Sequence, residues 1–186
     1  MDQTLDRIER CFAQIKNKYY SINKKVFFNP YQSSQYCIFL YFLANTIWNN
    51  FQENLVCDKL FYLNKTLNSI DLFYKVEMPA IFYLDHPVGS VIGRGKFADF
   101  FQFRQNCTVG NNKGYYPEFG RNVHLWSGVT IVGKCLIGDN VTFGSGCYVK
   151  DQDIPANTYV FGRSPSIVIK EKKCKELRES DFFHFS

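Results

Sequence analysis

Residues 119–149 read FGRNVHLWSGVTIVGKCLIGDNVTFGSGCYV, and apolar side chains recur in this stretch every six residues. The first apolar row consists of Phe119, Leu125, Ile131, Ile137, Phe143 and Val149. A second row, offset from the first by four residues, consists of Val123, Val129, Cys135, Val141 and Cys147. Neither the 3.6-residue period of a helix nor the two-residue period of a strand produces two rows with this spacing.

A triangular coil accounts for the six-residue period. Each side of the coil is a short strand with an inward apolar side chain, each corner is a turn, and successive coils stack as parallel strands about 4.8 Å apart. Short repeats of this kind are typical of solenoids. The pattern therefore predicts a mainly β fold, a parallel β-helix of hexapeptide repeats, in which Cys135 and Cys147 are small core residues. The alternative is an ordinary β domain with a chance periodic run.

The repeat continues upstream and is interrupted once. Phe97, Phe103 and Val109 keep the spacing of six, whereas Ile92 is one residue out of step. The next interval, from Val109 to Phe119, is ten residues, so four extra residues must leave the coil. We therefore expect the segment NNKGYYP, residues 111–117, to form a protruding loop. Loops on rigid scaffolds often carry functional residues.

The N-terminal part of the chain has a different periodicity. Residues 1–74 favour a helical region, with helices near residues 5–15, 33–50 and 55–67. Asn29-Pro30 should separate the first helix from the second. The sequence thus predicts a helical region over residues 1–74, the β-helix over residues 75–170 and a C-terminal tail over residues 171–186.

Composition restricts the class of protein. The net charge of +5 is not gathered into a basic stripe and no nucleic-acid motif occurs, which argues against nucleic-acid binding. The seven cysteines are odd in number and form no Cys-x-x-Cys pair, and no signal peptide is recognised, so we expect reduced thiols in a cytoplasmic protein. The longest apolar run, residues 38–44, is too short to span a membrane.

Three motifs accompany the repeats: LDHPVGSVIG at residues 84–93, QNCTVGN at residues 105–111 and FGRSP at residues 161–165. Together they resemble the left-handed β-helix acyltransferases, and most closely serine acetyltransferase and its relatives, over roughly residues 71–170. The resemblance implies a left-handed coil, acetyl-CoA as co-substrate, a hydroxyl-bearing small-molecule acceptor and no metal. It also implies a homotrimer that binds coenzyme A in a groove between adjacent subunits.

The resemblance assigns His86 as the general base. A neutral imidazole can take the proton of an acceptor hydroxyl while the oxygen attacks a thioester carbonyl. Asp71, fifteen residues upstream, matches the carboxylate that orients this imidazole, and Glu77 is a rival for that role. Asp85 matches an acid that the family uses toward the acceptor.

The same resemblance suggests a set of coenzyme A contacts near the end of the coils. Glycines would allow close backbone approach, and cations would meet the phosphates. The candidates are Gly144, Gly146, Gly162, Arg163, Ser164 and Lys170, with Lys172 and Lys173 as further phosphate candidates.

The predicted loop departs from the family. Tyr115, Tyr116 and Pro117 stand where serine acetyltransferase has Arg-His-Pro, so the cation and the second imidazole are missing. Two phenol rings suit stacking against a sugar ring. We therefore expect O-acetylation of a sugar or polysaccharide precursor, with serine or another amino acid as the alternative acceptor. The tail ends in DFFHFS and not in Ile, which argues against docking into cysteine synthase.

Two other classes of function compete with an acetyltransferase. The first is a non-catalytic, trimerising β-helix module in which the LDH motif is incidental. The second is a metal-dependent hydratase of the carbonic anhydrase type, which needs three His ligands. Only His86 and His124 lie within the predicted coils.

Overall fold

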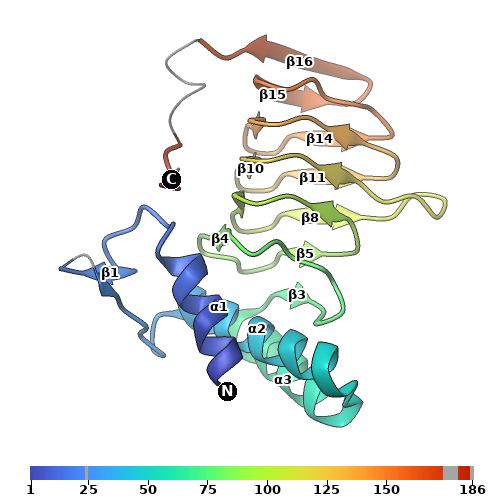
Figure 1. Cartoon of the computed structure of the whole chain (residues 1–186). Helices are drawn as coiled ribbons and strands as arrows, with labels where there is room; N and C mark the ends of the chain where they lie inside the picture. Colours follow the sequence, from blue (N-terminus) through green and yellow to red (C-terminus); the bar gives the residue numbers. More distant parts are fainter. Residues whose placement is uncertain (24, 174–179, 185–186) are drawn as a thin grey trace.

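The computed structural model describes residues 1–23, 25–173 and 180–184. Triangular β coils are stacked in a column, and helices close one end of the column (Figure 1). The helices are α1 (Asp2–Phe12), α2 (Ser33–Phe51) and α3 (Asn54–Asn68), close to the predicted ranges. A short hairpin of β1 (Ser21–Ile22) and β2 (Lys25–Val26), which the sequence did not predict, lies between α1 and α2.

The parallel strands form three sides. Side 1 contains β3 (Asp71–Leu72), β5 (Val91–Ile92), β8 (Thr108–Gly110), β11 (Thr130–Val132) and β14 (Tyr148–Lys150). Side 2 contains β4 (Phe82–Leu84), β7 (Phe101–Phe103), β10 (His124–Leu125) and β13 (Thr142–Phe143). Side 3 contains β6 (Lys96–Phe97), β9 (Glu118–Phe119) and β12 (Leu136–Ile137). The architecture confirms the predicted β-helix fold and is consistent with a left-handed coil.

The last coil is closed by a hairpin. β15 (Thr158–Arg163) pairs in parallel with both β13 and β14, so it runs along side 2 and round the corner to side 1. β16 (Ser166–Glu171) pairs with β15 in the antiparallel direction.

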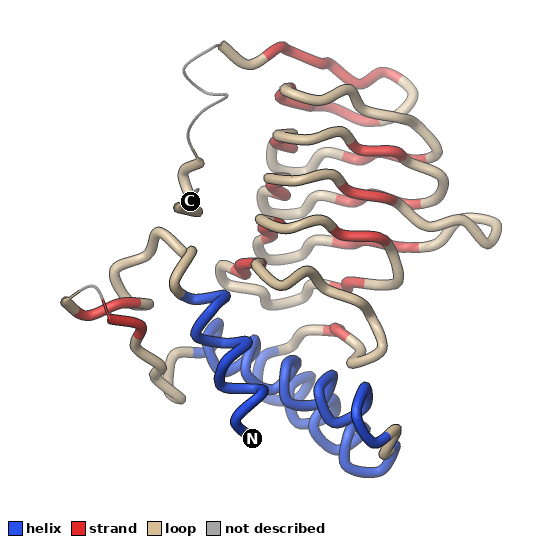
Figure 2. The backbone as a smooth tube through the Cα atoms, in the orientation of Figure 1, coloured by secondary structure: helices blue, strands red, loops and turns tan. Residues whose placement is uncertain are grey.

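Strand register confirms the interruption of the repeat. Leu125 lies opposite Phe143, eighteen residues later, but on its other side it lies opposite Phe103, twenty-two residues earlier. The four extra residues leave the column between β8 and β9, where a loop projects from the stack (Figure 2). The predicted excursion over residues 111–117 is therefore present.

Both apolar rows point into the column. Every residue of the two rows is buried, Phe119 being the most exposed at 5%. Cys135 and Cys147 are core residues, as the periodicity predicted. All six described cysteines are free and buried, and Cys174 lies outside the described residues.

The helical region ends earlier than the predicted residue 74. Ser69 caps α3 in the left-handed conformation, with φ 51°. Asp71 and Leu72 then already pair with β5 as the first strand of side 1. The sequence missed this boundary because Leu72 continues the apolar spacing of the preceding helix.

The helices seal the open end of the column. The Tyr41 hydroxyl donates to the Val76 carbonyl at 2.6 Å and accepts from the Met78 amide at 3.0 Å. The Asn45 amide donates to the Tyr74 carbonyl at 2.8 Å. Polar backbone groups of the first coil are thereby paired, which matters because an uncovered coil edge would invite aggregation. Within the described residues, no helix is long and apolar enough to cross a membrane.

The C-terminal residues cover the outer face of side 2. Phe182 and Phe183 lie 4.9 Å and 6.0 Å, centroid to centroid, from the His124 ring. The Lys16 amide donates to the Phe182 carbonyl and the His184 amide to the Gln14 carbonyl, so the tail is tied to the chain after α1. Burial, together with the charge of Lys172, lowers the pKa of His124 to about 3.

We predict that Phe143→Ala lowers the free energy of unfolding by about 3–5 kcal/mol, because Phe143 is fully buried and its loss leaves a cavity. Leu136→Ala, at a side chain that is 59% exposed on β12, should change stability by no more than about 0.5 kcal/mol. Denaturant unfolding of both variants measures the difference. Equal losses would show that the inward row does not carry the stability of the column.

His124 should make stability depend on pH. Its folded pKa lies below the unfolded value of 6.5, so the unfolded chain binds the extra proton and stability falls as pH drops below 6.5. At pH 4.5, protonation of His124 in the unfolded chain lowers the free energy of unfolding by about 2–3 kcal/mol. His124→Leu should lack this pH dependence. The wild-type free energy of unfolding minus that of the variant should therefore fall by that amount between pH 7.5 and pH 4.5. A pH-independent difference would contradict the prediction.

Candidate active site

His86 lies on an enlarged turn at the corner that joins side 2 to side 1. Six residues, 85–90, connect β4 to β5, whereas four residues connect β7 to β8, β10 to β11 and β13 to β14. Ile92 is out of step with the downstream row for a separate reason, because only five residues, and not six, separate it from Phe97 on the next side. His86 adopts φ 53°, and its side chain is 83% exposed. A non-glycine residue in this conformation is strained, a condition common at functional sites.

The carboxylate beside His86 already has a cationic partner. Asp85 Oδ1 lies 3.6 Å from His86 Nε2, and Asp85 Oδ2 lies 3.2 Å from a guanidinium nitrogen of Arg104. The Arg104 guanidinium stacks on the Trp126 ring at 4.0 Å. Burial and the neighbouring Asp85, to which the Tyr83 hydroxyl is hydrogen-bonded, raise the pKa of Tyr83 to about 12. Arg104 was not predicted from the sequence, because nothing in the hexapeptide spacing marks it.

Asp71 lies next to the enlarged turn, but its carboxylate binds elsewhere. Its backbone amide donates to the Ser90 carbonyl, and its Oδ2 accepts from Lys65 Nζ at 2.7 Å. Glu77 is exposed, and its charge acts on Arg7 and on Tyr41 in the helices. Of the two candidate partners for His86, Asp71 is thus the one whose backbone contacts the turn. Its role in orienting the imidazole stays a prediction.

The corner that carries His86 repeats along the column. Gly89, Asn106, Gly128 and Gly146 occupy successive turns of this corner, with φ between 58° and 74°. The turns are linked, since the Gly128 amide donates to the Gln105 carbonyl and the Gly146 amide to the Ser127 carbonyl. A Cβ built on Gly146 would meet nothing within 4 Å, so the backbone there is open to a ligand. From β5 to β15 the corner rises by four strand spacings, or about 19 Å.

Several predicted coenzyme A residues gather at the far end of this corner. Gly162 adopts φ 86° in β15 and pairs with Ile167. The next residue, Arg163, holds its guanidinium 4.9 Å from the Tyr148 ring. Ser164 Oγ accepts from the Lys150 amide at 3.1 Å and donates to the Gln152 side chain.

Two of the predicted coenzyme A residues, Gly144 and Lys170, lie against the Phe161 ring and do not border open space. A Cβ on Gly144 would come within 2.5 Å of the Phe161 ring, so this glycine serves close packing. Lys170, on β16, places its ammonium group 5.9 Å from the same ring. Of the predicted glycines, Gly146 is therefore the one with a free approach.

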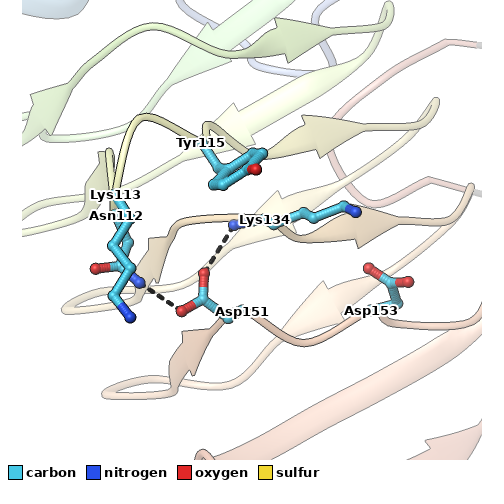
Figure 3. Close-up of a pocket in the computed structure, with 6 residues that line it drawn as sticks. All are labelled: Asn112, Lys113, Tyr115, Lys134, Asp151 and Asp153. Carbon is cyan, nitrogen blue, oxygen red and sulfur yellow. Dashed lines mark hydrogen bonds between the residues drawn. The ribbon is translucent and has the colours of Figure 1, made fainter.

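The loop of residues 111–117 lies at a different corner, the one that joins side 1 to side 3. Asp151, after β14, holds its base: Oδ1 accepts from the Lys134 amide at 2.9 Å and Oδ2 accepts from the Asn112 side chain (Figure 3). Tyr115 is 57% exposed and Tyr116 38% exposed. Within one chain, the two tyrosines and His86 occupy different corners of the coil, so the column does not bring these predicted site residues together.

Comparison with known proteins agrees with this geometry. Residues 116–151 match the family described as bacterial transferase hexapeptide (six repeats). The chain is 22% identical over 153 residues to serine acetyltransferase of Staphylococcus epidermidis, a match that covers 74% of this chain and 65% of that protein. The chain thus spans slightly less than two thirds of that relative's length.

Solved structures show the same fold. A serine acetyltransferase in complex with CoA superposes with a TM-score of 0.73 at 17% identity, over 91% of this chain and 70% of that one. Serine acetyltransferase 1 from Entamoeba histolytica gives 0.59 at 22% identity, over 68% of this chain and 51% of that one. By its coils and these matches, the chain is similar to the hexapeptide-repeat transferases that fold as a left-handed β-helix. Among the relatives it matches are serine acetyltransferases.

Asp151→Ala should loosen the loop without unfolding the column. It removes the hydrogen bond from the Asn112 side chain at the loop base and the one from the Lys134 amide of the neighbouring coil, and we expect about tenfold faster amide exchange over residues 111–117. Asp153→Ala is the matched control, because its carboxylate accepts only the Leu136 amide among the contacts of the described residues. Hydrogen exchange that is unchanged in the loop, or equally faster in both variants, would contradict the anchoring role.

Proposed function

We propose that this protein is an acetyl-CoA-dependent O-acetyltransferase with His86 as its general base. The observation that carries the proposal is the shared corner: an exposed imidazole on an enlarged turn stands in line with the open turn at Gly146 and with Gly162 and Arg163 at the end of the corner. An elongated co-substrate lying along this corner would place its thioester beside His86 and its phosphates near the hairpin of β15 and β16.

The reaction needs one base at the acceptor. His86 takes the proton of the acceptor hydroxyl as its oxygen attacks the thioester carbonyl. The new ester C–O bond forms, the C–S bond breaks, and the proton passes from the imidazolium to the departing thiolate. Arg104 holds the Asp85 carboxylate in place, with Asp85 Oδ1 3.6 Å from the Nε2 atom of His86.

For the acceptor, the relatives favour serine over a sugar. The expectation of a sugar rested on the loop, where two tyrosines stand in place of the family's Arg and His, and nothing in the comparisons supports it. The curated relatives that match the chain are serine acetyltransferases, as are the two solved structures named above. We therefore take the hydroxyl of a free amino acid, L-serine first, as the acceptor.

The same proposal includes a homotrimer. His86 and the loop tyrosines lie at different corners of one chain, so an acceptor that touches both needs the loop of a second copy. The loop projects away from its own column, which is the geometry that reaching a neighbour requires (Figure 2).

His86→Ala should lower the rate of acetyl transfer to L-serine by at least about 100-fold, the scale on which general-base catalysis acts. Release of the coenzyme A thiol, measured over a panel of hydroxyl acceptors, provides the assay. His184→Ala, at an exposed histidine that contacts the chain through its backbone amide, is the matched control and should retain activity. No thiol release with any acceptor would favour the non-catalytic module instead.

Mixing subunits tests the shared site. His86→Ala chains and Tyr115→Ala/Tyr116→Ala chains should each be weakly active alone. Denatured together and refolded, they should regain part of the wild-type activity, because some interfaces then combine an intact His86 with an intact loop. Absence of recovery, in mixtures that sedimentation shows to be trimers, would place the whole site within one subunit.

A further inference from the structure

A hollow opens beside the loop on the face that carries both tyrosines. Its walls are formed by residues 94–96, after β5, by residues 114–118 of the loop and β9, and by Lys134, after β11. We call it the loop hollow. It combines three segments that are far apart in the sequence, from the coil before the loop, the loop itself and the coil after it.

The loop hollow carries excess positive charge. Arg94, Lys96 and Lys134 contribute three cations and Glu118 one carboxylate, a net charge of +2. Lys96 and Glu118 neutralise one another at 2.8 Å. Arg94 and Lys134 remain, and neither forms an ion pair within the part of the chain that the structure describes. Two such cations in one hollow repel each other and favour binding of an anion.

Two neighbouring carboxylates lie outside the loop hollow. Asp151 and Asp153 line an adjoining hollow that shares Tyr115 and Lys134 with the loop hollow (Figure 3). Both oxygens of Asp151 accept hydrogen bonds at the loop base, and Asp153 Oδ1 accepts from the Leu136 amide at 2.7 Å. These carboxylates are engaged with the backbone and with Asn112, and the Lys134 ammonium group lies 6.0 Å from the Tyr115 ring.

We infer that the loop hollow binds the carboxylate of the acceptor, with Arg94 and Lys134 as the residues that determine specificity. This inference rests on the proposed acetyltransferase function. The guanidinium of Arg94 can bind a carboxylate through two parallel hydrogen bonds, Lys134 supplies a second positive charge, and the phenol groups of Tyr115 and Tyr116 can donate further hydrogen bonds.

The assignment accounts for the missing cation of the loop. The loop itself offers two phenols, but the coil before it contributes Arg94 and the coil after it contributes Lys134 to the same hollow. A neutral sugar would leave both of these cations unpaired, whereas an acceptor with a carboxylate pairs them. The charge of the hollow therefore favours the amino-acid acceptor independently of the relatives.

Paired acceptors test the inference. L-serinamide keeps the hydroxyl and the amine of L-serine but lacks the carboxylate. With the wild-type protein, we expect the KM for L-serinamide to exceed that for L-serine by at least tenfold. Arg94→Ala and Lys134→Ala should each raise the KM for L-serine about tenfold with kcat within about twofold, and should leave the KM for L-serinamide unchanged. Arg94→Lys should restore part of the loss, and Lys59→Ala on the exposed face of α3 controls for net charge.

The outcomes separate this inference from the proposed function. If the wild-type protein acetylates L-serine but the variants do not differ from it, or if serine and serinamide are used equally, the carboxylate site is wrong and the acetyltransferase stands. If no acceptor is used, the proposed function fails, and the hollow is then tested by titration with 3-hydroxypropionate. Shifts of the loop amides in NMR spectra that disappear in Arg94→Ala/Lys134→Ala would support a carboxylate site, and unchanged spectra would overturn it.

Discussion

Burial of one apolar side chain on each side of each coil is the constraint on which the whole structure depends. A single coil encloses too little apolar surface to be stable, so each coil needs a neighbour above and below it. The requirement fixes the register, because a shift of the stacking would misalign Leu125 with Phe103 and Phe143. It also leaves two ends exposed. The helices seal the first coil, and the hairpin of β15 and β16 closes the last one (Figure 1).

The candidate site residues lie where the column departs from its regular repeat. Two segments depart from the repeat: the turn of residues 85–90, which is two residues longer than the turns stacked on it, and the loop of residues 111–117. Neither departure disturbs the inward rows, because both insertions lie at corners and project outward. The stack thus holds an exposed imidazole and an exposed pair of phenols on a rigid support, at two different corners of the column.

Charge distribution distinguishes the two corners. At the His86 corner, the Asp85 carboxylate is paired with Arg104, whose guanidinium is stacked on Trp126 and lies 5.7 Å from the Phe182 ring of the C-terminal tail. At the loop corner, Arg94 and Lys134 add positive charge around Tyr115 and Tyr116. An acceptor held between these corners would meet a fixed imidazole and carboxylate at one end and a cationic hollow at the other. The folded tail contributes to the first of these environments through its contact with Arg104.

The amino-acid sequence determined the features that repeat or that interrupt a repeat. The period of six yielded the coil, the buried rows and the loop, and the helical spacing yielded the three helices, because these patterns are local along the chain. Only the tertiary structure decided which side chains meet. Arg94 and Lys134 are forty residues apart and share a hollow because the column stacks their coils on either side of the loop. Asp85 binds Arg104, and Asp71 binds Lys65, through contacts that no spacing encodes. The sequence therefore located His86 and the loop, whereas folding decided the charges that surround them.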